Sequence, residues 1–154
     1  MATQRANPPW GRPRVFLGSL ELPPHGSVPL SMPGTRGTPD PEAVTLADAL
    51  AARYPSLRRE VEARLFEHLR SLGEQAPEGG SLPRLAAPDQ VWSCVSLDHV
   101  CIGQEGGHAP IELVLEPAWD EDCALRLRIH DWGHLELVDE PVPPPPAHLR
   151  VSRL

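Results

Sequence analysis

Two cysteines and two histidines lie close together in the second half of the chain, at Cys94, His99, Cys101 and His108. Thiolate and imidazole are the groups that zinc prefers, and a structural site uses four of them in a tetrahedron. The spacing here matches none of the Cys-x2-Cys or His-x3-His patterns typical of metal sites. We therefore expect no metal and no other cofactor, and we keep these four residues as the alternative ligand set.

A second chemistry that these residues could support is nucleophilic catalysis. His99 and Cys101 are two positions apart and would share one face of a strand, and Cys94 is a second candidate thiol. Such catalysis also needs an acid that orients the histidine and a site that stabilises an oxyanion. The sequence identifies neither. We therefore expect no cysteine nucleophile, because a buried cysteine is a common core residue.

Acidic residues and histidines gather at two later turns, residues 119–122 and 131–134, with His130 beside the second. Carboxylates near histidines could hold a divalent cation or act as general acids and bases. A small hydrolase or metal-dependent enzyme that uses Asp120, His130 and His134 is therefore the alternative function. We favour a solvated turn in which Asp120 accepts backbone N–H bonds, because the calcium-loop pattern is absent.

The same two turns carry tryptophans, and Trp beside acids and arginines is the residue mix of interface hot spots. The formal net charge of -7 favours a basic protein partner. It argues against nucleic acid, since phosphate binding requires clustered cations. We predict a binding surface, anchored by Trp132, that consists of Trp119, Asp120, Glu121, Asp122, Asp131, Trp132 and His134.

Apolar and polar residues alternate in the segments between positions 111 and 138 that must position these turns. A period of two with one polar face predicts three antiparallel strands that are covered on one side. Residues 87–92 predict a short helical turn before a fourth strand. In that strand the apolar positions change parity between Leu97 and Val100, which predicts a bulge near Asp98 and His99.

The first half of the chain predicts a hairpin and two helices. The strands of the hairpin are 15–22 and 27–32, and Pro29 suits an edge strand. The helices begin at Asp40, are separated at Pro55 and end at Gly73. We predict an α+β fold with an N-terminal β-hairpin, two helices and a four-stranded antiparallel meander, with the helices packed on one face.

Domain limits and compartment follow from composition. We expect an N-terminal Pro-rich arm at 1–13, a single α+β domain at 14–140 and a Pro-rich C-terminal tail at 141–154. No run approaches the length of a membrane span, and the N-terminus has no apolar core of a signal peptide. Three cysteines cannot all pair, so a cytoplasmic chain with reduced thiols is the simplest interpretation.

Several segments together carry a resemblance to a known family. They are the helical VEARLFEHLRSL, the D-x-V-W segment at 89–92, the D-H-V of 98–100, and IELVLEPAWDEDCALRLRI at 111–129. Over residues 14–140 the chain resembles a family of small bacterial domains of unknown function, whose hallmark is W-D-x-E-H-G between two strands. Cys123-Ala124 stands where the family has His-Gly.

The resemblance implies a fold more than an activity. Such domains resemble, in size and charge, immunity proteins and accessory proteins encoded near toxins or defence genes. We therefore expect a non-catalytic protein-binding domain, an immunity or accessory protein that neutralises or regulates a basic toxin or enzyme. A structural protein that self-associates through its sheet edge, as a homo-oligomer, is the third class.

Overall fold

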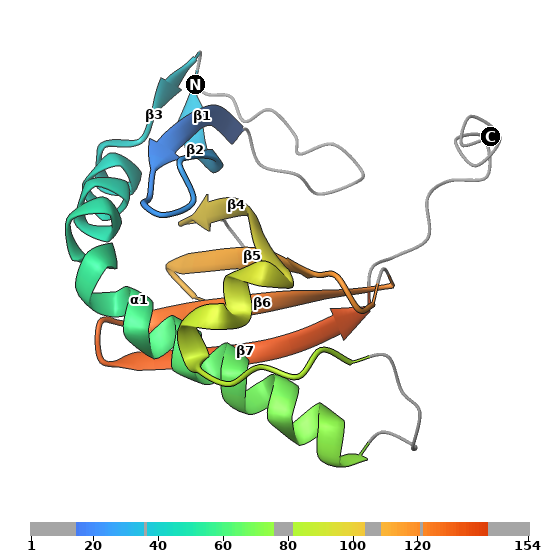
Figure 1. The fold of residues 1–154 in the computed structure, drawn as a ribbon. Helices are drawn as coiled ribbons and strands as arrows, with labels where there is room; N and C mark the ends of the chain where they lie inside the picture. The colour runs from blue at the N-terminus through green and yellow to red at the C-terminus, as the bar shows by residue number, and fades with distance from the viewer. Residues whose placement is uncertain (1–14, 36, 76–81, 104–108, 121, 142–154) are drawn as a thin grey trace, which may run out of the picture.

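One mixed β-sheet forms the body of the protein, and a long helix and a short 3-10 helix pack on it (Figure 1). The computed structural model describes residues 15–35, 37–75, 82–103, 109–120 and 122–141. The elements in chain order are β1 Val15–Glu21, β2 Ser27–Thr35, β3 Thr38–Pro39, α1 Pro41–Gln75, η1 Pro88–Ser93, β4 Val95–Ile102, β5 Ile111–Pro117, β6 Cys123–Asp131 and β7 His134–Pro141.

The sheet has seven strands in the order β1-β2-β4-β5-β6-β7, with β3 paired to β2 off this path. Neighbouring strands are antiparallel except β2 and β4, which run parallel with Leu30 opposite Val100 and Ser31 opposite Cys101. A parallel pair needs a crossover connection. Here the crossover is made by α1 and η1, which therefore lie between the first hairpin and the rest of the sheet in sequence.

The predicted fold class is wrong in two respects. The N-terminal hairpin and the later strands belong to one seven-stranded mixed sheet, because β2 pairs with β4. The two predicted helices are one helix, which contains Pro55 and continues past Gly73 to Gln75. Proline removes one backbone hydrogen bond and bends a helix, but it does not have to end it when both halves are packed.

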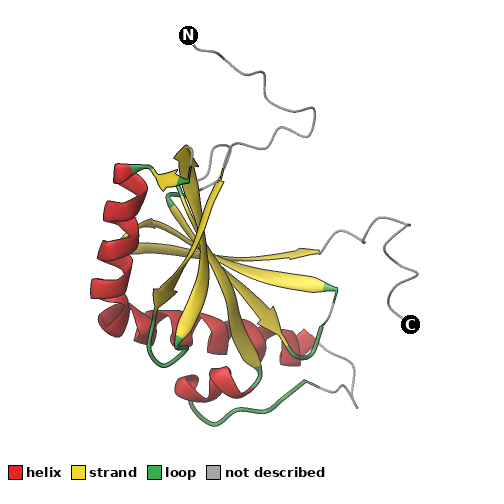
Figure 2. Ribbon diagram, turned by 90° about the horizontal axis from the view of Figure 1, so that it is seen from above, coloured by secondary structure: helices red, strands yellow, loops and turns green. Residues whose placement is uncertain are grey.

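The bend lets α1 follow the twisted sheet, and Figure 2 shows the helix changing direction along its length. Buried residues lie on both sides of Pro55, with Leu50 and Tyr54 before it and Leu57 and Val61 after it. Apolar burial contributes roughly 1.5–3 kcal/mol per large side chain. That packing on each half holds the helix together across the missing hydrogen bond.

The alternating strands place their apolar residues against the helices. The core includes Val100 and Ile102 of β4, Leu113 and Leu115 of β5 and Leu127 of β6, all of which are buried. The bulge predicted in β4 is confirmed, since the register shifts between Leu97 and His99. The short helical turn predicted at 87–92 is confirmed as η1. The predicted edge position of Pro29 is wrong, because β2 lies between β1 and β4.

On the other face, which no described element covers, one line of residues crosses six strands. We call it the central row, and its members are successive Cα partners: Leu17, Ser31, Cys101, Glu112, Arg128 and Glu136. Neighbouring strands are about 4.8 Å apart, so adjacent members of the row lie within reach of one another.

Within the described part of the chain, no helix is long and apolar enough to cross a membrane.

Candidate functional site

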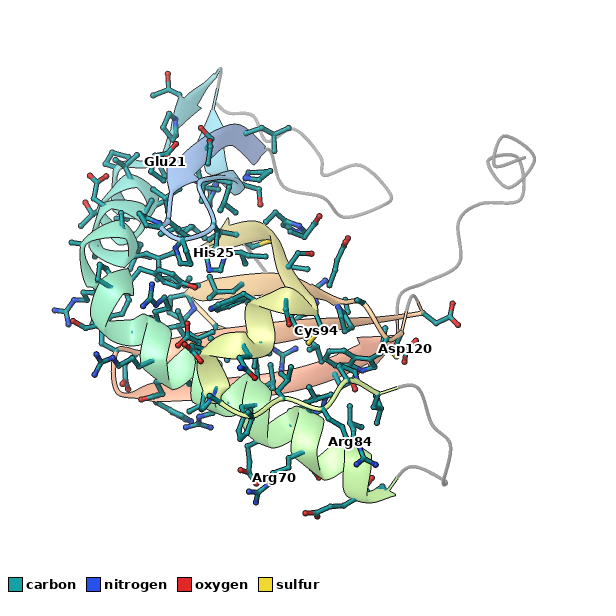
Figure 3. The ribbon with its side chains drawn as sticks, viewed as in Figure 1. Glu21, His25, Arg70, Arg84, Cys94 and Asp120 are labelled. Atoms are coloured by element: carbon teal, nitrogen blue, oxygen red, sulfur yellow. The ribbon has the colours of Figure 1, made fainter. Side chains whose placement is uncertain are left out.

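A pocket of about 350 Å³ opens at the end of the sheet where β5 turns into β6. Leu72 and Leu82 contribute apolar walls, and Trp119, Asp120 and Asp139 also line it. Figure 3 shows Asp120 at this end of the sheet. We call it the Trp119 pocket. It combines apolar surface, an indole and two carboxylates from β-strand ends, which is the residue mix that the sequence predicts for a binding surface.

Cys123 lies between the two carboxylates of this pocket. Hydrogen bonding to Asp120 and then partial burial raise the pKa of the Cys123 thiol to about 11, and Asp139 adds to the shift. The thiol is therefore protonated at neutral pH and is no nucleophile. His68 lies 3.5 Å from Asp139, between its Nε2 atom and the carboxylate Oδ2. The pocket therefore has two lining carboxylates, Asp120 and Asp139, with an imidazole beside the second.

The turn between β5 and β6 has the structure expected for Asp120. Its Oδ1 atom accepts a hydrogen bond of 3.0 Å from the backbone N–H of Asp122. The interpretation of Asp120 as a turn residue that accepts backbone N–H bonds is confirmed. Asp122 is exposed beside it, and Glu121 lies outside the described residues. The acidic turn is held by its own backbone and presents its charge outward.

The other residues of the predicted surface lie at the opposite end of β6. Nine residues at about 3.3 Å each separate the two ends, so Asp120 is roughly 25 Å from His130 and His134. Those three residues therefore do not assemble into one catalytic or metal site. The predicted surface of 119–122 and 131–134 is likewise two patches rather than one.

Trp132, the predicted anchor, is half-buried and packs under a cation from the long helix. The guanidinium carbon of Arg53 lies 4.9 Å from the centre of its ring. Asp131 is exposed and accepts a 2.8 Å hydrogen bond from the backbone N–H of Gly133. His134 is exposed, with its ring 4.7 Å from that of His130. The Trp132 ring is therefore engaged by the long helix, and Asp131 is engaged within its own turn.

A second cluster of reactive side chains lies on β4 and β2. Nδ1 of His99 is 2.6 Å from Oδ2 of Asp98. Hydrogen bonding to Cys101, with a further contribution from Asp98, raises the pKa of His99 to about 9. Burial tends to raise the pKa of Cys101, but hydrogen bonds to His99 and Ser31 outweigh it and lower that pKa. Asp98 is the orienting acid that sequence reasoning did not find. The sequence signal that could have found Asp98 is the predicted bulge at Leu97–His99, because a bulge can bring two successive side chains to the same side of a strand.

A pocket of about 300 Å³ lies beside this cluster. Leu17, Pro29 and Leu30 are its apolar lining residues, and Ser31, Asp98 and His99 are its polar ones. Leu17 is 76% exposed, the highest value of any large hydrophobic side chain whose burial is described. We call it the Leu17 pocket. Both residues that hydrogen-bond to Cys101 therefore line the same hollow.

The four residues of the alternative metal set do not come together. His99 and Cys101 are neighbours, whereas Cys94 lies at the far end of β4, where its carbonyl accepts a 2.8 Å hydrogen bond from Ala118. His108 falls outside the described residues. No group of three or more His, Cys, Asp or Glu side chains among the residues that the structure places could hold a metal ion.

A buried polar cluster that the sequence analysis missed joins α1, η1 and the turn after β1. His25 lies in that turn (Figure 3), and its Nε2 atom is 2.6 Å from the hydroxyl oxygen of Tyr54. The His25 ring also packs edge-on against Trp92 at 4.3 Å. Trp92 in turn contacts Glu62 of α1. These residues are far apart in the sequence and carry no shared motif, so no sequence signal could have grouped them.

Comparison with known proteins gives one match. A family model described as a domain of unknown function, DUF6985, matches residues 26–140. No curated protein and no solved structure matches the chain. The resemblance to a family of unknown function is confirmed at that level, and the match runs from β2 into β7 and includes the residues of the Trp119 pocket, whereas Leu17 of the Leu17 pocket lies outside it. The chain belongs to the DUF6985 family of domains of unknown function.

Proposed function

We propose that this domain is a non-catalytic module that binds a basic protein, and that the Trp119 pocket receives a cationic side chain of that partner. The observation that carries the proposal is the convergence of Asp120 and Asp139 beside an indole and an apolar wall. An arginine side chain matches each part. Its guanidinium can bond to both carboxylates and stack on the indole, and its methylene stem can cover Leu72 and Leu82.

Electrostatics favours such a ligand over a neutral one. Two carboxylates that share one thiol repel each other, and an arriving cation would relieve that repulsion. The exposed Asp122 adds negative charge at the rim. The chain as a whole carries 21 acidic against 14 basic residues, which would raise the encounter rate with a basic partner.

In its more specific form, the proposal is that the domain acts as an immunity or accessory protein in a bacterium and neutralises a basic toxin or enzyme. Trp119-Asp120 is also the segment on which the resemblance to the small bacterial domains rests, and we propose that this segment carries the shared binding role. The enzymatic alternative based on Asp120, His130 and His134 has no support from the geometry, because those residues lie at opposite ends of β6.

A matched pair of peptides tests the pocket directly. The probe is a short peptide with one arginine between two leucines, and its control carries neutral citrulline instead. Indole N–H signals are followed by nuclear magnetic resonance, and Trp119→Phe identifies the signal of Trp119. The arginine peptide should shift that signal and bind at least about tenfold more tightly than the citrulline peptide, or ~1.4 kcal/mol.

Two variants with the same charge change complete the test. Asp120→Asn with Asp139→Asn should abolish the shift, whereas Asp48→Asn with Asp89→Asn, at exposed positions elsewhere, should preserve it. Equal binding of the two peptides, or equal binding by the two double variants, would show that the pocket does not recognise the positive charge of the arginine. A partner recovered from cells counts as support only when the Asp120/Asp139 variant loses it and the control variant keeps it.

A further inference from the structure

Cys101 lies at the centre of the open sheet face with a polar group on either side. It occupies the central row between Ser31 and Glu112, and His99 is two residues before it on the same strand face. Both Ser31 and His99 hydrogen-bond to its thiol. Asp98 holds Nδ1 of His99 at 2.6 Å, which leaves Nε2 as the ring nitrogen for the thiol. The order of groups is thiol, imidazole and carboxylate.

We propose that Cys101 is a nucleophilic thiol that accepts an acyl group from a small thioester, with His99 as its acid–base partner and the Leu17 pocket as the seat of the acyl chain. Asp98 is then a positioning residue that acts through His99. The reactive site is distinct from the Trp119 pocket, and it goes beyond the binding role proposed above.

The charge distribution supports a thiolate at this position. Burial alone would raise the pKa of Cys101, yet hydrogen bonds to His99 and Ser31, together with the positive charges of His99 and Arg126, lower it. The pKa of His99 is raised to about 9 by Cys101 and Asp98. A histidine that stays protonated at neutral pH beside a thiol is the arrangement that activates cysteine nucleophiles.

The environments of the other two cysteines raise the pKa of their thiols, so Cys101 is the cysteine expected to react first. Burial raises the pKa of Cys94 despite a hydrogen bond to Ser93, and carboxylates raise that of Cys123 to about 11. Cys94 lies at the other end of β4, about seven residues or roughly 23 Å away along the strand. Cys123 lies beyond the far end of the β5–β6 pairing. Neither cysteine is placed to form a disulfide with Cys101, so an external electrophile is the partner that the geometry favours.

The pocket favours an acyl chain over a polar electrophile. Leu17 and Pro29 supply exposed apolar surface, and the polar residues of the lining are Asp98 and the two partners of the Cys101 thiol, His99 and Ser31. A volume of about 300 Å³ is at the small end of ligand sites. An aliphatic chain seated against Leu17 would cover that exposed side chain, and its carbonyl end could reach Cys101 past Ser31, which lies between Leu17 and Cys101 in the central row.

The reaction balances without any oxidant or cofactor. The Cys101 thiolate attacks the thioester carbonyl carbon, and a new carbon–sulfur bond forms to Cys101. The original carbon–sulfur bond breaks, its electron pair leaves with the departing sulfur, and Nε2 of His99 gives up its proton to that sulfur. The products are S-acyl Cys101, a free thiol and neutral His99, which regains a proton from solvent.

The test uses the full chain with S-octanoyl-N-acetylcysteamine and its S-acetyl analogue, and intact mass with peptide mapping locates the adduct. We expect acylation at Cys101 ahead of Cys94 and Cys123, and faster with the octanoyl probe. Leu17→Ser should remove the preference for octanoyl, whereas Leu82→Ser, in the Trp119 pocket, should leave it unchanged. Cys101→Ser should abolish the adduct.

Alkylation by iodoacetamide tests the reactivity of the Cys101 thiolate independently of acyl-chain binding in the Leu17 pocket. Its rate at Cys101 should reach its plateau at a lower pH than for a free thiol, and His99→Gln should slow it about tenfold at pH 7. Asp98→Asn should move the plateau to higher pH, and Asp98→Glu should restore it, a readout that a purely structural role would not move. Melting temperatures establish that each variant is folded.

Two results would overturn the inference. If Cys101 reacts with iodoacetamide at the same rate and with the same pH dependence as Cys94, its thiol is not activated. If iodoacetamide labels Cys101 selectively but the octanoyl group is not transferred faster than the acetyl group, Cys101 is an activated thiolate and the Leu17 pocket does not bind an acyl chain. Neither result bears on the arginine-peptide test of the Trp119 pocket.

Discussion

The indole Nε1 of Trp92 donates a hydrogen bond of 2.6 Å to Oε2 of Glu62, a carboxylate that is only 5% exposed. Arg58, one helical turn earlier, places its Nε atom 3.4 Å from the same oxygen. Because Trp92 belongs to η1 and Glu62 to α1, this contact fixes the short helix on the long one. It also sets the start of β4, which leads to Asp98, His99 and Cys101.

Removing the indole donor should destabilise the protein. In Trp92→Phe the Glu62 carboxylate stays buried and loses its hydrogen bond, which costs about 1–3 kcal/mol. Urea unfolding measures the change. Glu60→Gln, at an exposed position of the same helix, is the control and should stay within about 0.5 kcal/mol of the native protein. A Trp92→Phe protein as stable as the control would mean that the buried carboxylate finds another donor.

His25 should make stability fall in mild acid. Burial lowers the pKa of His25 below its ordinary value of 6.5, with help from Arg58 and against the effect of Glu62. The unfolded chain therefore binds this proton more readily than the folded protein. The stabilising contribution is present above pH 6.5 and is lost as the pH falls below it. His25→Gln should flatten the fall in the free energy of unfolding between pH 6.5 and 5, measured by urea unfolding at several pH values.

His99 should act in the opposite direction on the alkaline side. Its pKa is raised to about 9 in the folded protein, from an ordinary value of 6.5. Its contribution to stability is therefore complete below pH 6.5 and is lost as the pH rises toward 9. His99→Gln should reduce the loss of stability between pH 7 and 9, measured by urea unfolding at several pH values. An unchanged slope in that variant would show that the imidazole is not held by Asp98 and Cys101.

Glu112 should be the most sensitive charged residue of the central row. Its Oε2 atom accepts a 2.9 Å hydrogen bond from Nε of Arg128, and its Oε1 atom lies 3.5 Å from Arg126. The side chains of Glu112 and Arg128 are both only 11% exposed, so solvent screens this pair weakly. Glu112→Ala should cost about 1–3 kcal/mol. Glu116→Ala, exposed on the same strand face, is the matched control and should have little effect.

Features that depend on neighbours in the chain were predictable from the sequence. The alternation around Leu113 and Leu127, the bulge at Asp98 and the turn at Asp120 depend on side chains a few positions apart. Each has a short physical cause: strand periodicity, a parity change, and a carboxylate that accepts a nearby backbone N–H. The acidic Trp119 turn was recognised for the same reason.

Features that depend on distant segments were not predictable. The parallel pairing of Leu30 with Val100 joins strands separated by the whole of α1, and it turned a predicted hairpin and meander into one sheet. Pro55 has the same local signature in a bent helix as between two helices, and only packing on both halves decided the outcome.

The candidate sites divide in the same way. The amino-acid sequence by itself determined which residues face outward on each strand and which turns are acidic, because these follow from a period of two and from turn chemistry. Only the tertiary structure decided that Asp139 joins Asp120, that Ser31 reaches Cys101, and that Asp120 and His130 lie at opposite ends of β6. Strand order and register set those distances, and both are fixed by the packing of the whole sheet.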